Sequence, residues 1–155
     1  MRSFVSCMMH CVFATKRRER WLSADLRERL WPYLAGIARE NDIRAVAIGG
    51  VEDHVHLLVS LPSTMTIAKA MQLLKGNSSK WIHETFPDMR AFAWQGGYGA
   101  FSIGVSGVEA TTQYIKQQEE HHRRVSFRDE FIVMLRKHQI AFEEWMLDDD
   151  AEVSA

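Results

Sequence analysis

The chain has 155 residues, of which 46% are hydrophobic and 25% are charged. These values are typical of one globular domain and leave little room for a second. The formal net charge of −1 argues against a uniformly basic protein that coats nucleic acid, although local basic patches can still contact phosphates. No stretch approaches the roughly 20 consecutive apolar residues of a membrane span, and the N-terminus lacks the pattern of a secretion signal. We therefore expect a cytoplasmic protein that does not enter membranes.

The first half of the chain predicts three strands, of which the first two are joined by a helix and the last two by a hairpin. Residues 4–15 are rich in Val, Phe, Cys and Met and predict a first strand. A serine N-cap and helical spacing of leucines predict a helix over residues 23–40. Two apolar segments, 43–48 and 55–61, predict a hairpin whose turn lies at the glycines 49–50.

The second half continues the alternation of helices and strands. In chain order, the predicted elements are a helix over 66–86 that is weakened at 76–79, an aromatic, glycine-rich loop over 92–99, a strand over 100–105, a helix over 108–122 and a further helix that begins near Ser126. The order β-α-β-β-α-β followed by helices predicts an α+β fold. We expect a ferredoxin-like sandwich with an antiparallel sheet and additional C-terminal helices. Residues 1–147 form the expected single domain, and residues 148–155 form an acidic tail.

Two histidines, His54 and His56, begin the predicted strand over 55–61. Because side chains alternate along a strand, both imidazoles project from the same face and can hold one divalent ion. His-x-His is short and common, so a pair of strand histidines without a ligand explains this spacing about equally well. If a metal is bound, the pair also suits a zinc hydrolase.

A second cluster lies on the helix over 108–122, where Tyr114 and Gln118 are four residues apart and share a face. Alone, a helical tyrosine is more often a packing residue. Together with His54 and His56 it indicates chemistry, because a phenol with a pKa of about 10 is a poor nucleophile at neutral pH. A metal that polarises a phosphodiester offsets this weakness. These residue types favour strand transfer through a phosphotyrosine over simple hydrolysis.

The chain resembles the single-tyrosine HUH transposases of small bacterial insertion sequences, and within them the solitary relatives associated with repetitive extragenic palindromes. The resemblance covers roughly residues 3–140, with the motifs in the expected order. The matching segments are Asp53-His54-Val55-His56-Leu57-Leu58-Val59, Trp94-Gln95-Gly96-Gly97-Tyr98-Gly99-Ala100-Phe101-Ser102 and Tyr114-Ile115-Lys116-Gln117-Gln118-Glu119-Glu120-His121-His122, preceded by Phe13-Ala14-Thr15-Lys16-Arg17-Arg18 at the exit of the first strand.

The resemblance implies an endonuclease and strand transferase that depends on Mg²⁺ or Mn²⁺ and acts on single-stranded, hairpin-forming DNA. Tyr114 falls on the family's nucleophile, and His54, His56 and Gln118 fall on its metal ligands. The implied product is a 5′-phosphotyrosine and a free 3′-hydroxyl, and a second 3′-hydroxyl then displaces Tyr114. The resemblance also implies a homodimer.

Basic, polar and aromatic residues outside these motifs are predicted to contact the DNA. Side chains that would contact phosphates follow the first strand or lie on the second helix, and two aromatic rings would stack on an unpaired base. These residues are Lys16, Arg17, Arg18, Lys75, Asn77, Lys80, Trp94 and Tyr98.

Two alternative functions remain open. One is a catalytically inactive protein that binds hairpin DNA with the same fold, which the intact set of Tyr114, Gln118 and two histidines argues against. The other is a zinc-dependent hydrolase built on His54 and His56. The sequence offers this hydrolase no third His, Cys or carboxylate ligand with firm spacing, although Asp53 or Glu52 could be proposed.

Overall fold

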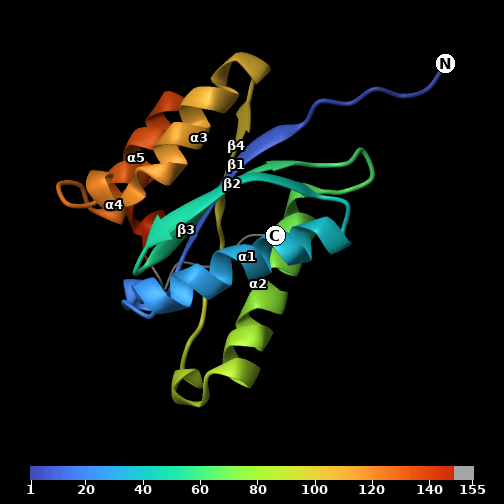
Figure 1. Cartoon of the computed structure of the whole chain (residues 1–155). Coiled ribbons are helices and arrows are strands. Elements are labelled where there is room, and N and C mark those ends of the chain that lie inside the picture. Colours follow the sequence, from blue (N-terminus) through green and yellow to red (C-terminus); the bar gives the residue numbers. More distant parts are fainter. Residues whose placement is uncertain (149–155) are drawn as a thin grey trace.

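The structure, a computed structural model, describes residues 1–148. Four strands form one antiparallel sheet in the order β2-β3-β1-β4 (Figure 1). Helix α1 links β1 to β2, and α2 links β3 to β4, which confirms the expected ferredoxin-like order. The bounds are β1 Met8–Ala14, α1 Ala24–Glu40, β2 Arg44–Val51, β3 His54–Ser60, α2 Ile67–Thr85 and β4 Gly99–Ile103. Of the predicted acidic tail at 148–155, only Asp148 lies within the described residues.

Helices α1 and α2 cover one face of the sheet. Alternate residues of the central strands, such as Phe13 and Leu57, pack against leucines of α1 and against Met71 and Leu74 of α2. Each fully buried side chain of this size stabilises the fold by about 1.5–3 kcal/mol. Ser23 accepts a hydrogen bond from the backbone N–H of Leu26 at 3.2 Å and so caps α1 as predicted.

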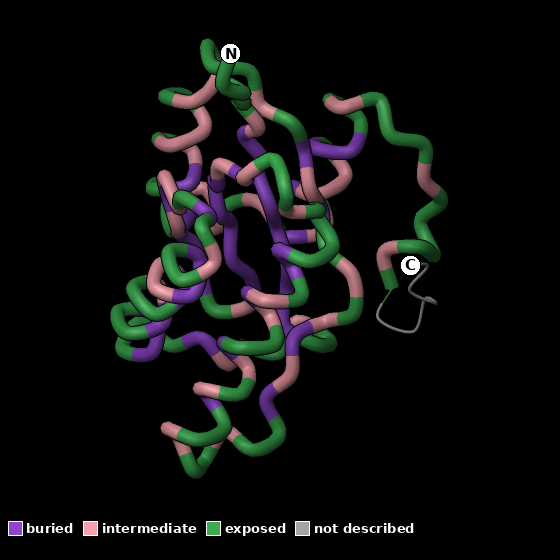
Figure 2. Tube along the Cα trace, turned by 90° about the vertical axis from the view of Figure 1, so that its right-hand side faces the viewer, coloured by how far each residue is buried: buried purple, intermediate pink, exposed green. Residues whose placement is uncertain are grey.

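Three further helices cover the opposite face of the sheet (Figure 1). They are α3 (Val108–Lys116), α4 (Gln118–His121) and α5 (Phe127–Lys137). Here Val12 and Phe101 pack against Phe127 of α5, and Leu58 packs against Ile115 of α3. The sheet is therefore buried on both faces, and the most deeply buried segments in Figure 2 follow its central strands.

The local structure departs from the expected elements in three places. The glycines 49–50 lie inside β2, and Glu52 and Asp53 make the hairpin turn. The helix over 108–122 is interrupted at Gln117, which separates α3 from α4. The weak segment over 76–79 is regular helix within α2. Burial of Ser78, and of Leu74 and Ile82 one turn to either side of it, outweighs the low helix propensity of glycine and asparagine.

Gly49 allows the tyrosine-bearing helix to lie directly on β2. A Cβ atom at this position would overlap the backbone carbonyl oxygen of Ile115 in α3. The absence of a side chain therefore sets how closely α3 approaches the sheet.

No helix in the described part of the chain is both long and apolar enough to cross a membrane.

Candidate active site

Strand β3 places both histidines on the face covered by α3, α4 and α5. His54 and His56 are fully buried, and they pair in register with Ala14 and Val12 of the neighbouring β1. Because side chains alternate along a strand, Val55, Leu57 and Val59 point to the other face of the sheet and pack in the core beneath α1 and α2. The expectation that the two imidazoles share a face is confirmed.

Each of these histidines is oriented through its Nδ1 atom. Nδ1 of His54 lies 2.7 Å from Oδ1 of Asp53, and because a carboxylate only accepts, Nδ1 of His54 donates. Nδ1 of His56 lies 2.8 Å from Nε2 of His10 on β1. A donor at Nδ1 leaves a lone pair at Nε2, which is the arrangement that a metal-binding histidine needs.

Tyr114 lies in the last turn of α3, and Gln118 is the first residue of α4. Gln118 is buried, and its Oε1 lies 3.1 Å from Nε2 of His54. The Tyr114 hydroxyl donates to Oε2 of Glu130, and its ring packs 5.8 Å from the ring of His56, centroid to centroid. The four residues expected to act together therefore meet in one chain.

Glu130, in the first turn of α5, is the centre of this cluster. Its side chain is 2% exposed. Oε1 lies 2.9 Å from Nε2 of His56 and 3.4 Å from Nε2 of His54. Oε2 accepts from the amide of Gln118 at 3.1 Å as well as from Tyr114. Ser126 caps α5 through the N–H of Asp129 and so fixes the helix start that presents Glu130.

His122 supplies a further nitrogen that faces the same carboxylate. Its Nδ1 donates to the carbonyl oxygen of Val125 at 2.6 Å, so Nε2 carries a lone pair. That Nε2 is buried without a hydrogen-bond partner and lies 3.1 Å from Oε2 of Glu130. Ligand atoms of His54, His56, His122 and Glu130 all lie within 4.8 Å of one another. When the Nε2 atoms carry no proton, these acceptors face one another, and a cation between them would relieve their repulsion, so the donor set fits a metal ion.

The close packing of these groups shifts the pKa values of His54, His56 and Glu130. Burial opposes a charge on His54, but hydrogen bonds to Asp53 and Glu130 outweigh it and raise the pKa of His54 to about 9. Burial lowers the pKa of His56 to about 4. Burial also acts to raise the pKa of Glu130, but its histidine partners outweigh burial and hold that pKa well below the usual range. The carboxylate is therefore ionised, and without a metal His54 is protonated near neutral pH, so a metal that binds Nε2 of His54 must displace that proton.

The hydroxyl of Tyr114, the predicted nucleophile, is partly buried and borders a cavity. Burial, followed by the contact with Glu130, raises the pKa of the Tyr114 phenol above its ordinary value. A cavity of about 450 Å³ opens beside it, between α3, α5 and the β1 and β4 strands. His10, Tyr114, His121 and Glu130 line this cavity, which gives a phosphodiester a route to the hydroxyl.

Residues 3–118 of the chain match the family described as "Transposase IS200 like". The chain belongs to this family of IS200-like transposases. It is 29% identical over 124 residues to the transposase of insertion sequence element IS200 from Salmonella typhimurium LT2, covering 76% of this chain and 80% of that protein. Members act as DNA endonucleases and strand transferases, so the chain is an enzyme.

Two solved structures share the fold of this transposase. A crystal structure of a transposase candidate from Deinococcus radiodurans R1 superposes with a TM-score of 0.64 at 27% identity, covering 76% of this chain and 95% of that one. A REP-associated tyrosine transposase bound to a REP hairpin superposes with a TM-score of 0.60 at 15% identity, covering 81% and 74%.

Most of the residues expected to contact DNA lie on the surface of the transposase. Lys16 and Arg17 are exposed in a short turn, η1 (Lys16–Arg18), that follows β1, and Arg18 is partly buried there. Asn77 and Lys80 are exposed on α2, and Tyr98 is 42% exposed. These placements leave each of the six side chains accessible to a strand of DNA.

Two of the expected DNA contacts have other roles in the structure. Trp94 is buried between the rings of Phe13 and Phe92, and its Nε1 donates to Ser78 at 3.0 Å. Trp94 is only 9% exposed, which leaves little ring surface for a base, and its contact with DNA stays a prediction. Lys75 donates to the carbonyl oxygens of Gln95 and Gly97, both at 2.7 Å, and so holds the glycine-rich loop.

The sequence did not single out Glu130 or His10 for a role in this site. A glutamate in the first turn of a helix ordinarily stabilises the helix dipole, and a histidine on a strand has no distinctive spacing. His121 and His122 were noted only as neighbours of the tyrosine motif. The sole signal for Glu130 is its position on the side of α5 that carries Phe127 and Met134, which marks it as a buried charge that needs partners.

Proposed function

We propose that this transposase cuts and rejoins single-stranded DNA that folds into hairpins, through a covalent 5′-phosphotyrosine on Tyr114. One observation carries the proposal. The Tyr114 hydroxyl and the Nε2 atoms of His54 and His56 meet at one buried carboxylate, Glu130, beside a cavity that opens to solvent. A phenol placed against a set of metal-ligand atoms suits attack on phosphorus, and little else that a tyrosine does in proteins.

The metal that we propose is Mg²⁺ or Mn²⁺. His54, His56 and Gln118 would hold it, as the family resemblance implies, with Glu130 as a fourth ligand. When bound, such an ion polarises the non-bridging oxygens of the scissile phosphate and offsets their charge as attack proceeds. Mixed nitrogen and oxygen ligands with a carboxylate are suited to these ions.

The residues of the chain account for each bond change. Tyr114 Oη forms a bond to phosphorus while the bond between phosphorus and the 3′-oxygen breaks. The phenolic proton passes to one of the two acceptors beside it, Oε2 of Glu130 or Nε2 of His121, which lies 3.5 Å away. The departing 3′-oxygen takes up a proton from water. Attack by another 3′-hydroxyl reverses the same steps, and the phosphate bond energy is retained for rejoining.

The hairpin substrate and the homodimer are also part of the proposal. The REP-associated relative was solved bound to a REP hairpin, and this supports a hairpin ligand for a chain with the same fold. Because His54, His56, Gln118 and Tyr114 of one chain already form one site, a second copy would add DNA-binding surface and no missing active-site residue.

The decisive experiment uses a labelled pool of DNA hairpins with randomised unpaired flanks, incubated with the protein and Mg²⁺ or Mn²⁺. A protein–DNA adduct that survives denaturing electrophoresis is expected with the native chain and absent in Tyr114→Phe. Tyr33→Phe, on α1 at the opposite face, is the matched control and should form the adduct normally. Cleavage that persists in Tyr114→Phe rules out the mechanism. His54→Ala and His56→Ala should bind the hairpins without cutting them.

A zinc-dependent hydrolase is the second candidate, because Glu130 and His122 supply the third and fourth ligands that the sequence lacked. Three imidazoles and a carboxylate suit zinc well. Tight, stoichiometric zinc binding without any effect of DNA would favour this function. An inactive hairpin-binding protein would instead bind the pool and form no adduct.

A further inference from the structure

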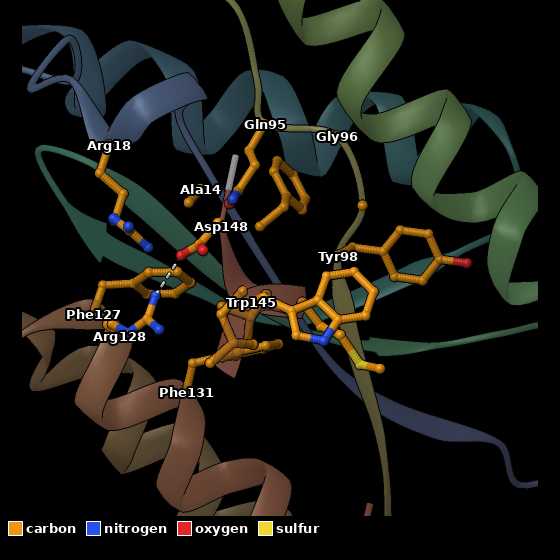
Figure 3. Close-up of a pocket in the computed structure, with 16 residues that line it drawn as sticks. Ala14, Arg18, Gln95, Gly96, Tyr98, Phe127, Arg128, Phe131, Trp145 and Asp148 are labelled. Carbon is orange, nitrogen blue, oxygen red and sulfur yellow. Dashed lines mark hydrogen bonds and ion pairs between the residues drawn. The ribbon is translucent and has the colours of Figure 1, made fainter. Parts of the chain in front are cut away.

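A second cavity lies beside the active site, on the far side of His54. It has a volume of about 530 Å³ and is formed by the end of β1, the loop over 95–99, the start of α5 and a short helix near the C-terminus, η4 (Glu144–Leu147). Figure 3 shows the rings of Tyr98 and Trp145 on one side of this cavity and the guanidinium groups of Arg18 and Arg128 on the other. We call it the aromatic cavity.

We propose that the aromatic cavity binds one unpaired nucleobase of the DNA strand, with its phosphate held by Arg18. This inference rests on the proposed function, since it assigns a base-binding subsite next to the cleavage site. Four features of the cavity argue for this ligand.

The first feature is exposed aromatic surface inside a concave site. Trp145 is 55% exposed and Tyr98 is 42% exposed, while Phe127 and Phe131 form the inner wall. Apolar surface gathered in a cavity usually marks a binding site. Planar rings stack on any nucleobase because every base has a π-face.

The second feature is a polar group that is free to read a base edge. Gln95 points into the cavity in Figure 3, and among the described residues only its backbone atoms are hydrogen-bonded. A free side-chain amide offers both a donor and an acceptor. The loop that carries it is held rigidly by Lys75, which bonds the carbonyl oxygens of Gln95 and Gly97, and by Gly97 with its φ of 82°.

The third feature is positive charge at the mouth of the cavity. Arg18 has no ion pair among residues 1–148, and its backbone is held at a φ of 52°, an uncommon conformation for a residue other than glycine. Arg128 donates to Oδ1 of Asp148 at 3.0 Å and to the carbonyl oxygen of Glu144 at 3.1 Å, so Asp148, which also lines the cavity, balances its charge and Arg18 is the guanidinium available to a phosphate. A guanidinium is a geometric match for phosphate oxygens, and contacts of this kind position a nucleic acid strand.

The fourth feature is the position of the cavity relative to the metal-ligand histidines. Phe127 lines the cavity with one part of its ring and packs against His54 with another, with the two ring centroids 4.6 Å apart. Ala14, at the cavity floor, is the register partner of His54. A strand whose phosphate lies at His54 and Tyr114 therefore has a neighbouring nucleotide within reach of the cavity.

The test uses the Tyr114→Phe protein, which leaves DNA uncut, and a single-stranded oligodeoxythymidylate that carries one 2-aminopurine. Stacking quenches 2-aminopurine, so a fall in its fluorescence on binding is expected. Trp145→Ala and Tyr98→Ala, made in the same background, should abolish the quenching and weaken binding about tenfold. Trp145→Phe should retain both, since phenylalanine also stacks. Tyr33→Ala is the matched control, because Tyr33 stacks on Trp81 on the opposite face of the sheet, and it should behave as the parent does.

Quenching and affinity in Trp145→Ala and Tyr98→Ala equal to those of Tyr33→Ala would overturn the proposal. Unchanged thermal unfolding of each variant shows that the loss does not arise from misfolding. The outcome is separable from that of the proposed function, which is read from the covalent adduct on Tyr114. Stacking without an adduct supports the cavity and rejects the cleavage, whereas an adduct without stacking does the reverse.

Discussion

At the scale of single residues, the burial of Glu130 defines the chemistry of the site. A carboxylate removed from water is destabilised by several kcal/mol unless partners compensate. Glu130 has compensation from a phenol, an amide and several imidazoles, of which the Nε2 atoms of His56 and His122 lie within 3.1 Å of it. The ligand atoms of His54, His56, His122 and Glu130 also lie within 4.8 Å of one another, so the same cluster can serve as a coordination shell once the Nε2 atoms of the imidazoles carry no proton.

We therefore predict that Glu130→Gln lowers the affinity for Mn²⁺ by tenfold or more, on the order of the losses seen when groups that support a metal site are removed. Glutamine preserves the shape of the side chain but removes the charge that attracts the cation. Isothermal titration and the electron paramagnetic resonance of free Mn²⁺ both report this affinity without requiring catalysis. Glu119→Gln, at a carboxylate whose side chain is 72% exposed, is the control. Equal affinities of the two variants would exclude Glu130 as a ligand.

A second prediction concerns His10, which touches the cluster only through His56. In the metal-bound form that we propose, Nε2 of His10, 2.8 Å from Nδ1 of His56, would accept its proton and leave Nε2 of His56 free for the metal. Burial lowers the pKa of His10 to about 3, which keeps the His10 imidazole neutral. His10→Leu should weaken Mn²⁺ binding about tenfold, because the orienting bond is lost. His10→Gln should restore much of it, since its amide oxygen can accept the same proton. If leucine and glutamine behave alike, His10 only fills space.

At the scale of elements, α3 delivers Tyr114 and depends on the contact of Gly49 with Ile115. We predict that Gly49→Ala pushes α3 away from the sheet, lowers the free energy of unfolding by about 1–3 kcal/mol and slows adduct formation by up to about 100-fold, as a displacement near 1 Å can. Urea unfolding and gel assays measure the two effects.

Gly76→Ala is the opposite control for this prediction. Gly76 lies inside α2 with nothing near the position of a new Cβ atom. Alanine there should raise the free energy of unfolding by about 0.5–1 kcal/mol and leave adduct formation unchanged. A loss of stability at Gly76 equal to that at Gly49 would show that close approach of α3 is not the cause.

These elements also show which features can be predicted from the sequence. Local patterns suffice for the caps, the helices and the shared face of His54 and His56, because periodicity and capping act within a few residues. Contacts such as His10 with His56, or Glu130 with His56, join residues 46 and 74 positions apart. They depend on strand order and on how α5 returns to the sheet, which no local pattern encodes. Trp94 illustrates the converse, since an aromatic residue beside glycines has the same local signature whether it is buried or exposed.

At the scale of the whole molecule, titration of the cluster should shape stability in the absence of metal. The pKa of His54 is raised to about 9 from 6.5, so its contribution is complete below pH 6.5 and is lost as the pH rises through 9. His10 and His56, with pKa values lowered to about 3 and 4, stabilise the fold above pH 6.5 and lose that contribution as the pH falls. We predict that the combined contribution of these three histidines is greatest near pH 6.5.

Urea unfolding in EDTA at a series of pH values measures this profile. His54→Gln should lack the alkaline loss that His54 contributes, and the difference between the two proteins cancels the titration of other groups such as Cys11. A difference that stays constant from pH 7 to 10 would contradict the raised pKa of His54.

The last prediction concerns how many chains build one active site. Tyr114 lies against His56 and Glu130 of its own chain, so we predict that each chain is catalytically complete. Co-expressed Tyr114→Phe and His54→Ala chains should then form no adduct, because neither carries every group. In a dimer that exchanged the tyrosine helix, one site of each mixed pair would be whole and an adduct would appear on the His54→Ala chain.

A second experiment dilutes the native chain with a chain that carries both Tyr114→Phe and His54→Ala. It also distinguishes a site formed within one chain from a site formed by two chains. Where each chain is complete, the yield of adduct falls in proportion to the native fraction. Where the tyrosine helix is exchanged, every mixed pair is inactive and the yield falls with the square of that fraction. A quadratic fall, together with an adduct from the first mixture, would show that the tyrosine of one subunit serves the histidines of the other, and that α3 leaves β2 on dimerisation. Gly49 allows the close contact between β2 and Ile115 of α3 within one chain. In such a dimer, Gly49→Ala would therefore disturb the packing of α3 on its own sheet without reducing the yield of adduct.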